Sequence, residues 1–169
     1  MSAMFRSAIA TPVGPLQLTV DDDGVLVEVL LPNREHRADS EAGSRSAQDG
    51  MRTVATQLTE YFEKKRQTFD VPLRPHGSRF EQRVWRRLLE IPYGETLSYG
   101  AIATEFEMEN GARAVGIANA RNPIPIIIPC HRVIGADGSL VGFGGGLPLK
   151  EKLLELEGAL GLRLPLEVL

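Results

Sequence analysis

Apolar residues alternate with polar ones in short runs over the first part of the chain. Three runs, residues 5–10, 16–20 and 25–31, are rich in apolar and β-branched side chains, which is typical of strands. The second and third runs are separated by Asp21–Gly24, whose final Asp-Gly pair favours a hairpin turn because glycine adopts positive φ without steric cost. The pattern therefore predicts an N-terminal antiparallel sheet.

The hydrophobic period changes from two residues to between three and four further along the chain. Residues 34–50 are polar and are predicted to form a loop, and residues 67–73 are a candidate for a further strand. Between them the apolar positions follow the spacing of an amphipathic helix, which we expect to rest on the sheet. These positions are Met51, Val54, Leu58, Tyr61 and Phe62.

A second block begins after Pro75-His76-Gly77, a turn-forming sequence. Ser78-x-x-Glu81 follows directly and is a capping box, in which the serine and glutamate side chains satisfy the free amides of a helix start. The helix is expected to end at Pro92-Tyr93-Gly94. Two domains are therefore predicted, residues 1–76 and 77–169. The side chains expected to be buried along this helix are Phe80, Val84, Trp85, Leu88 and Leu89.

Two shorter helices follow in the second block. Ser98 is placed to cap a helix from Tyr99 to about Glu107, and the polar break at residues 109–111 leads to a helix over residues 112–121. Two short helices joined by a tight glycine-containing turn fit a helix-turn-helix, although any small helical hairpin gives the same pattern.

The overall composition says little about function, but the local composition of one segment is unusual. The 169 residues are 43% apolar and 24% charged, as in soluble globular proteins, and the net charge of −3 gives no global sign of a nucleic-acid binder. Residues 110–135, however, contain no Asp or Glu and include Arg113, Arg121 and Arg132. The helix over 112–121 is also rich in alanine and glycine. It is either a packed core helix with two exposed arginines or a helix that enters a DNA groove.

Cys130 is the only cysteine of the chain, so a disulfide within the chain and a multi-cysteine zinc site are both excluded. A lone cysteine is either a small buried apolar residue or a nucleophile. The N-terminus has no apolar core long enough for a signal peptide, and no stretch approaches the roughly 20 apolar residues of a membrane span. A cytoplasmic protein without a membrane partner is expected.

The segment around Cys130 carries a family resemblance. Pro129-Cys130-His131-Arg132-Val133 resembles the signature of the O6-alkylguanine-DNA alkyltransferases, also called methylated-DNA–protein-cysteine methyltransferases. The resemblance is clear from about residue 80 to residue 158 and much less specific before that. The other matching segments are Ile91-Pro-Tyr-Gly-Glu-Thr-x-Ser-Tyr-Gly, Arg113-Ala-Val-Gly, Gly142-Phe-Gly-Gly-Gly and Lys150-x-x-Leu-Leu-x-x-Glu157-Gly158.

This resemblance implies an α/β fold in two parts: a ribonuclease-H-like sheet-plus-helix domain, then a mostly helical winged-helix-like domain with a helix-turn-helix. It implies irreversible, single-turnover transfer of methyl or larger alkyl groups to Cys130. The donors are O6-alkylguanine and, more weakly, O4-alkylthymine in double-stranded DNA. The protein is consumed in the reaction. No metal or cofactor is implied, and the expected state is a monomer.

The residues around Cys130 suit this chemistry. Removing a methyl group from an aryl-ether-like oxygen requires a soft nucleophile, and a thiolate is the strongest that a protein offers. If residues 130 and 131 are extended, their side chains point to opposite faces, so a water is expected to bridge Cys130 and His131. The resemblance implies a relay from Cys130 through water to His131 and Glu157, with Glu157 orienting the imidazole. The alternative is that Glu157 is an exposed residue before the helix-capping Gly158.

Further roles follow from the resemblance alone. The target atom is buried in the duplex, so the base must leave the stack. Arg113 is implied to fill the vacated space, and Tyr99 to rotate the 3′ phosphate and to donate to guanine N3. The carbonyls of Cys130 and Val133 and the amide of Gly144 are implied to contact the flipped base, and Arg132 to hold the loop. The implied DNA-binding residues are Tyr99, Ala112, Arg113, Gly116 and Arg121, and the implied pocket residues are Asn122, Pro125, Val133, Phe143, Gly144 and Gly145.

Three other classes of protein are alternatives to an alkyltransferase. Alkyltransferase-like proteins recognise lesions without repairing them, but they lack the cysteine that is present here. A helix-turn-helix transcription regulator leaves the segment from Pro129 to Val133 and Glu157 unexplained. A cysteine hydrolase needs a base separate from the neighbouring His131, and none is evident in the sequence.

Overall fold

The computed structural model describes residues 3–40 and 43–159. The chain divides into two compact units: Met1–His76 with Pro123–Pro125, and Gly77–Asn122 with Ile126–Leu169. Within the described ranges, no helix is both long and apolar enough to cross a membrane.

The N-terminal unit is built on a three-stranded antiparallel sheet in the order β1 (Met4–Ile9), β2 (Leu16–Asp21) and β3 (Leu26–Leu30). Every residue of the central strand β2 is buried. Gly24, in the turn between β2 and β3, has a φ of 80°. The three strands and the Asp-Gly hairpin predicted from the sequence are therefore confirmed.

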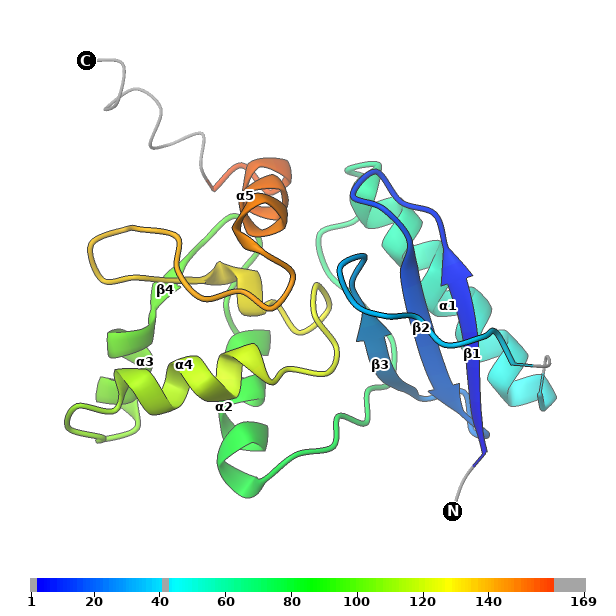
Figure 1. Cartoon of the computed structure of the whole chain (residues 1–169), viewed down its shortest axis with the longest axis horizontal. Helices are drawn as coiled ribbons and strands as arrows, with labels where there is room; N and C mark the ends of the chain where they lie inside the picture. Colours follow the sequence, from blue (N-terminus) through cyan, green and yellow to red (C-terminus); the bar gives the residue numbers. More distant parts are fainter. Residues whose placement is uncertain (1–2, 41–42, 160–169) are drawn as a thin grey trace. The chain divides into compact units, whose positions relative to one another are not determined.

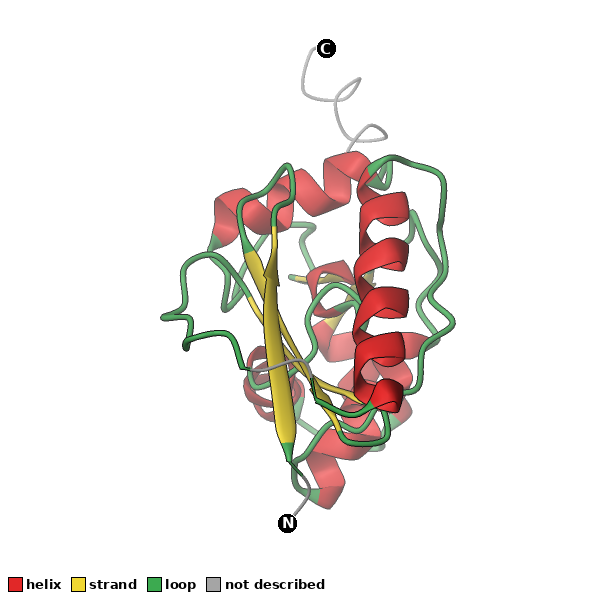
Figure 2. Cartoon of the chain, turned by 90° about the vertical axis from the view of Figure 1, so that its right-hand side faces the viewer, coloured by secondary structure: helices red, strands yellow, loops and turns green. Residues whose placement is uncertain are grey.

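Helix α1 (Arg45–Phe62) runs along one face of this sheet (Figures 1 and 2). Val54, Leu58 and Tyr61 are buried on its inner side, as the spacing predicted. The prediction of a loop over residues 34–50 is wrong at its end, because the helix already begins at Arg45. Ser44 caps it by accepting a hydrogen bond from the amide of Ala47 at 3.1 Å.

The strand expected over residues 67–73 is also absent from the described part of the unit. Leu73 forms a single isolated bridge with Leu26, through hydrogen bonds from Leu26 N to Pro72 O and from Arg74 N to Leu26 O, at 3.0 and 2.8 Å. The segment thus follows β3 for one residue pair only, and its Phe69 packs against the ring of Tyr61 of α1.

The C-terminal unit begins with α2 (Arg79–Leu89), whose capping box is confirmed. Ser78 Oγ accepts from Glu81 N at 3.1 Å, and Glu81 Oε1 accepts from Ser78 N at 2.8 Å. The buried stripe is Val84, Trp85 and Leu88. Leu89, expected inside, is 48% exposed, because it falls one position beyond this stripe.

Helices α3 (Tyr99–Glu105) and α4 (Ala112–Ala120) pack against each other and form the predicted helix pair. Ser98 caps α3 by accepting from Ala101 N at 3.0 Å. Trp85 of α2 donates from Nε1 to Ala118 O at 2.9 Å, which fixes the buried side of α4.

Three short elements position the segment that carries the cysteine. Cys130–Arg132 forms a single 3-10 turn, η1, which leads into β5 (Val133–Ile134). Strand β5 pairs in parallel with β4 (Leu97–Ser98), directly before α3. Helix α5 (Leu147–Leu156) packs on η1. Strands β4 and β5 have two residues each, which is too short to show an alternation of apolar and polar positions, so the sequence does not predict them.

Candidate active site

Cys130 is the first residue of η1 and is 5% exposed. The expectation of an extended backbone at Cys130 and His131 is wrong, because this segment is a helical turn closed by Arg132 N donating to Pro129 O at 3.0 Å. Burial raises the pKa of the Cys130 thiol to about 11. The resting protein therefore carries a thiol at neutral pH, and the chemistry needs a base to remove its proton.

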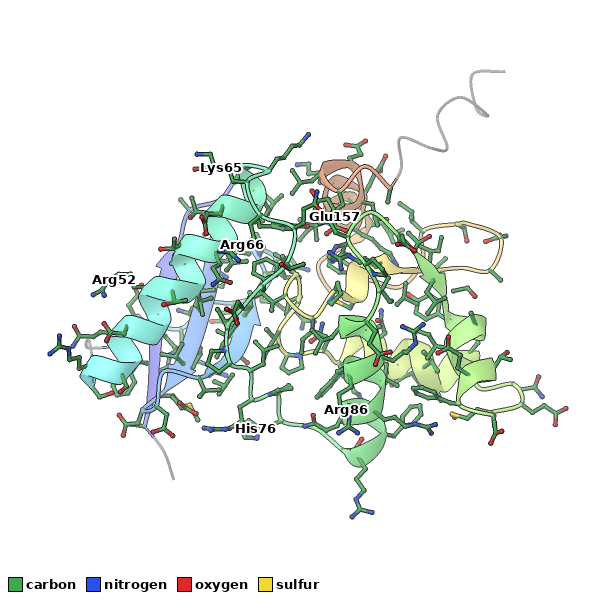
Figure 3. The ribbon with its side chains drawn as sticks, turned by 180° about the vertical axis from the view of Figure 1, so that it is seen from behind. Arg52, Lys65, Arg66, His76, Arg86 and Glu157 are labelled. Atoms are coloured by element: carbon green, nitrogen blue, oxygen red, sulfur yellow. The ribbon has the colours of Figure 1, made fainter. Side chains whose placement is uncertain are left out.

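His131 and Glu157 form a buried pair within the same unit. Glu157 is the C-cap residue of α5 (Figure 3), and its Oε2 lies 2.7 Å from His131 Nε2. Both side chains are fully buried, so the alternative that Glu157 is an exposed helix residue is wrong. Gly158, with a φ of 79°, ends the helix directly after it.

Arg132 binds the same carboxylate from a second side. Its Nε donates to Glu157 Oε1 at 2.8 Å, its Nη2 to Oε2 at 3.0 Å, and its Nη1 to the carbonyl of Ile91 at 2.7 Å. Burial alone would raise the pKa of Glu157, but the hydrogen bonds and charges of His131 and Arg132 hold it at about 2. The carboxylate is therefore ionised, and it is held by charge-assisted hydrogen bonds from both partners.

The ionised carboxylate determines the state of His131. Burial lowers the pKa of His131, so the imidazole is neutral at pH 7. A carboxylate only accepts hydrogen bonds, so Nε2 carries the single proton and Nδ1 presents a lone pair. His131 Nδ1 is buried and has no hydrogen-bond partner among the described residues. The arrangement leaves one basic nitrogen directed away from Glu157 and available to receive a proton.

Lys150 of α5 is completely buried, which is rare for a lysine. Its Nζ donates to Val133 O at 2.5 Å and to Val141 O at 2.8 Å, and lies 3.4 Å from the hydroxyl of Tyr99. Burial lowers the pKa of Lys150 to about 8, while the charge of a Cys130 thiolate raises it. In return, the ammonium group favours the thiolate form of Cys130.

Replacing Lys150 with methionine is expected to slow the reaction of Cys130 with iodoacetamide at pH 7. The substitution keeps most of the side-chain volume but removes a group that is charged at this pH and favours the thiolate. The measurement is the rate of labelling at pH 7, with Lys152→Met, at an exposed position of the same helix, as the control. An unchanged rate together with a lower melting temperature would mean that Lys150 only holds the loop.

Tyr99 and two asparagines complete the surroundings of Cys130. The Tyr99 hydroxyl donates to the Val141 or Gly142 carbonyl, at 2.8 and 3.1 Å, and burial raises its pKa to about 12. Asn122 Nδ2 donates to Ile128 O at 2.7 Å, and the Asn122 side chain also forms a hydrogen bond that lowers the pKa of Cys130. Asn119 Nδ2 donates to the carbonyl of Cys130 at 3.2 Å.

One face of α4 points outward and carries the residues expected to bind DNA. Ala112 and Arg113 are exposed, and Gly116 is half-buried against the ring of Tyr99. A methyl group at Gly116 would lie 3.7 Å from Tyr99 Cδ1, so the two elements approach closely here. Arg121, at the end of the helix, lies 3.6 Å from Glu81 and is therefore partly neutralised.

The expected pocket residues are less uniformly placed. Val133 is buried next to Cys130, and its amide donates to the Cys130 carbonyl. Phe143 and Gly145 are half-buried and Gly144 is exposed, all in the loop that precedes α5. Pro125 is buried and belongs to the N-terminal unit. Within the C-terminal unit, the structure thus places Val133 and Asn122 next to Cys130. Pro125 is not part of that unit.

Sequence reasoning missed Lys150 and Asn119 and underestimated Arg132. Helical spacing contains the missing signal. Lys150 precedes the buried Leu153, Leu154 and Glu157 by three, four and seven positions, so it shares their face of α5. Asn119 follows the buried Val115 of α4 by four positions. Within residues 3–40 and 43–159, no group of three or more His, Cys, Asp or Glu side chains has a geometry that could hold a metal ion.

The C-terminal unit combines a buried thiol, a histidine–carboxylate pair that begins at the next residue, and a helix pair with an exposed arginine. This combination is typical of a nucleic-acid-binding protein that transfers a group to a thiol. Residues 79–159 match the domain described as "6-O-methylguanine DNA methyltransferase, DNA binding domain", and residues 4–75 match the ribonuclease-like domain of the same family. The chain belongs to the 6-O-methylguanine DNA methyltransferase family.

Individual relatives agree with this assignment. A methylated-DNA–protein-cysteine methyltransferase of Methanosarcina mazei is 46% identical over 154 residues, which cover 91% of this chain and 97% of the relative. The enzyme of the same description from Mycobacterium tuberculosis is also 46% identical, over 88% of this chain and 89% of that one. The crystal structure of Mycobacterium tuberculosis OGT in complex with DNA matches with a TM-score of 0.79 and 44% identity, covering 90% of this chain and 91% of that chain. The family resemblance and the two-part α/β fold predicted from the sequence are confirmed.

Proposed function

We propose that this chain repairs DNA by transferring an alkyl group from O6 of guanine to Cys130 in a single irreversible turnover. The observation that carries the proposal is the neutral His131, which is held by Glu157 at 2.7 Å. Its Nδ1 is a buried base that has no hydrogen-bond partner among the described residues, and His131 follows the only cysteine directly in the sequence. A buried base of this kind compensates for the raised pKa of the thiol.

The atoms balance without a cofactor. The Cys130 proton passes through a bridging water to His131 Nδ1, and the resulting imidazolium is stabilised by the Glu157 carboxylate. The thiolate sulfur then forms a bond to the alkyl carbon while the bond from that carbon to O6 breaks. The electron pair stays on the base, which takes up one proton and becomes guanine. The thioether that forms on Cys130 is stable, so the protein is consumed.

The outward face of α4 is proposed to bind the duplex. Arg113 is exposed and can enter the space left by the extruded base, and the small side chains of Ala112 and Gly116 let the helix backbone approach the DNA. The exposed Arg121, although close to Glu81, contributes positive charge at the end of the same helix. Tyr99, whose ring lies against Gly116, is proposed to contact the displaced nucleotide. Its hydroxyl must first leave the carbonyls of Val141 and Gly142.

We also propose the wider setting of this activity. DNA binding and chemistry are assigned to residues 77–169, and a supporting role to residues 1–76. The substrate is double-stranded DNA with O6-alkylguanine, or more weakly O4-alkylthymine, and the protein acts as a cytoplasmic monomer. The glycines at 144 and 145 carry no side chains, so with Asn122, Val133 and Phe143 they are proposed to form a pocket for methyl and larger alkyl groups.

A repair assay on the DNA side tests the proposal. Duplex DNA containing O6-methylguanine is mixed with increasing amounts of protein, and the restored guanine is measured after digestion of the DNA. We expect the repaired lesions to equal the protein molecules added, one for one, and to stop at that number. Repair that continues for many turnovers, or no repair at all, would contradict single-turnover transfer.

Replacing Arg113 with alanine is expected to reduce repair of duplex DNA much more than alkyl transfer from the free base O6-benzylguanine. The side chain is exposed on α4 and serves base extrusion, which the free base does not need. The measurement is the pair of single-turnover rates for variant and wild type. Equal losses on both substrates would show that Arg113 acts on the pocket instead.

A further inference from the structure

Ile117 is a large apolar side chain on the outer face of α4 that the proposed function does not use. It is 47% exposed, and few other large apolar side chains are as exposed among the described residues. The buried side of the helix is formed by Val115, Ala118 and Asn119, so Ile117 contributes little to the core of the C-terminal unit. It shares its face with the exposed Arg113, because residues four apart are neighbours on a helix surface.

The residues next to Ile117 on this face are small. Gly116 has no side chain, and Ala120, three positions further along, is exposed. Ile117 therefore protrudes from a face that otherwise lets a second surface come close. Alanine favours a helix more than isoleucine does, so neither helix stability nor core packing explains an isoleucine at this position.

The charge of the outer face indicates what kind of partner it fits. Helix α4 contains no Asp or Glu, and Arg113 and Arg121 are exposed near its two ends. Arg121 is partly neutralised by Glu81 at 3.6 Å. A duplex matches this pattern, because a groove has phosphates along its edges and apolar parts of sugars and base edges between them. The face is also continuous with the surface proposed above to bind DNA.

The spacing along α4 places Ile117 close to the extruded base. A helix rises about 6 Å over four residues, and stacked base pairs lie about 3.4 Å apart. When Arg113 occupies the space of the extruded base, Ile117 is within about two base steps of it. In proteins that deform DNA, apolar side chains at such positions pack against and between base steps.

We propose that Ile117 is a positioning residue that packs against the sugars and base edges beside the extruded base. The contact is apolar, so it adds to the affinity for the duplex without releasing counterions from the phosphates. This inference rests on the proposed function, because it requires a duplex on the outer face of α4.

Single-turnover kinetics of Ile117→Ala test the inference. Methyl transfer from a duplex with O6-methylguanine is measured over a range of protein concentrations, at salt concentrations between about 50 and 200 mM. We expect the half-saturating protein concentration to rise about fivefold at every salt concentration, the effect of burying roughly half of an isoleucine side chain. The rate at saturation and the reaction with free O6-benzylguanine should keep their wild-type values, since neither depends on affinity for the duplex. Alanine is the better helix former, so the variant is expected to fold.

Two further variants serve as matched controls. Ile117→Leu keeps an apolar side chain of the same size and should stay within about twofold of the wild type. Leu89→Ala removes a side chain that is 48% exposed on α2 and should leave the half-saturating concentration unchanged.

Three results with Ile117→Ala would overturn the inference and leave the proposed function intact. They are an unchanged half-saturating concentration, an increase that Leu89→Ala reproduces, and an equal slowing of the reaction with O6-benzylguanine. Absence of methyl transfer from the duplex to the wild-type protein would overturn the proposed function as well.

Discussion

Replacing Cys130 with serine is expected to abolish alkyl transfer while leaving binding to lesion-containing DNA largely intact. A hydroxyl is far less acidic and less nucleophilic than a thiol, and His131 cannot compensate for that difference. The serine oxygen occupies nearly the same volume, so η1 and its hydrogen bonds to Asn119 and Val133, which use the backbone, should survive. The measurement is methyl transfer to protein at concentrations where gel shifts show equal DNA occupancy for variant and wild type.

The chain offers a clean background for this experiment, because Cys130 is its only cysteine. No second thiol can accept the alkyl group in the variant. Substantial transfer by Cys130→Ser at matched occupancy would therefore assign the acceptor to another side chain and refute the role of Cys130.

Replacing Glu157 with glutamine is expected to slow alkylation by about 10- to 1000-fold, because an amide neither fixes the His131 ring nor stabilises its protonated form. The structure adds a pH signature. The carboxylate raises the pKa of His131 against the opposing effect of burial, so its removal lowers that pKa further. The acid limb of the rate profile, where His131 takes up a proton, should move to lower pH while the plateau falls.

The control for this variant is Glu155→Gln, an exposed position on the same helix, which should react at the wild-type rate. Glutamine at 157 also leaves the buried Arg132 without its anionic partner, so melting temperatures must be compared alongside the rates. A lower melting temperature with an unchanged rate would reduce Glu157 to a structural partner of Arg132.

The parts of the fold that the sequence predicts are those with strong local signals. The Asp-Gly turn before β3, the capping box at Ser78 and the helix caps at Ser98 are decided by a few neighbouring residues. The start of α1 was not predicted from the sequence. Gly50 looks like a helix breaker, but it lies within α1. A glycine stands there because the helix and the turn at Gly24 approach too closely for a side chain at either position.

The candidate site shows the same division. The segment from Pro129 to Val133 identifies the nucleophile and its family, and the spacing to Glu157 follows from the resemblance. The contacts that hold these groups do not follow from the sequence. Helical spacing places Lys150 on the buried face of α5, but only the fold shows that Arg132 binds Glu157 and that Lys150 binds the carbonyl of Val133. Their contacts span 25 and 17 residues and depend on how α5 packs on η1.

Intact-protein mass spectrometry tests the central claim most directly. The wild-type protein is mixed with a duplex that contains one O6-methylguanine, its mass is measured, and the modified residue is located by peptide mapping. The account predicts that each reacting molecule gains the mass of one methyl group and that this group is on Cys130. An unchanged mass in the presence of bound lesion DNA, or a methyl group on any other residue, would contradict it.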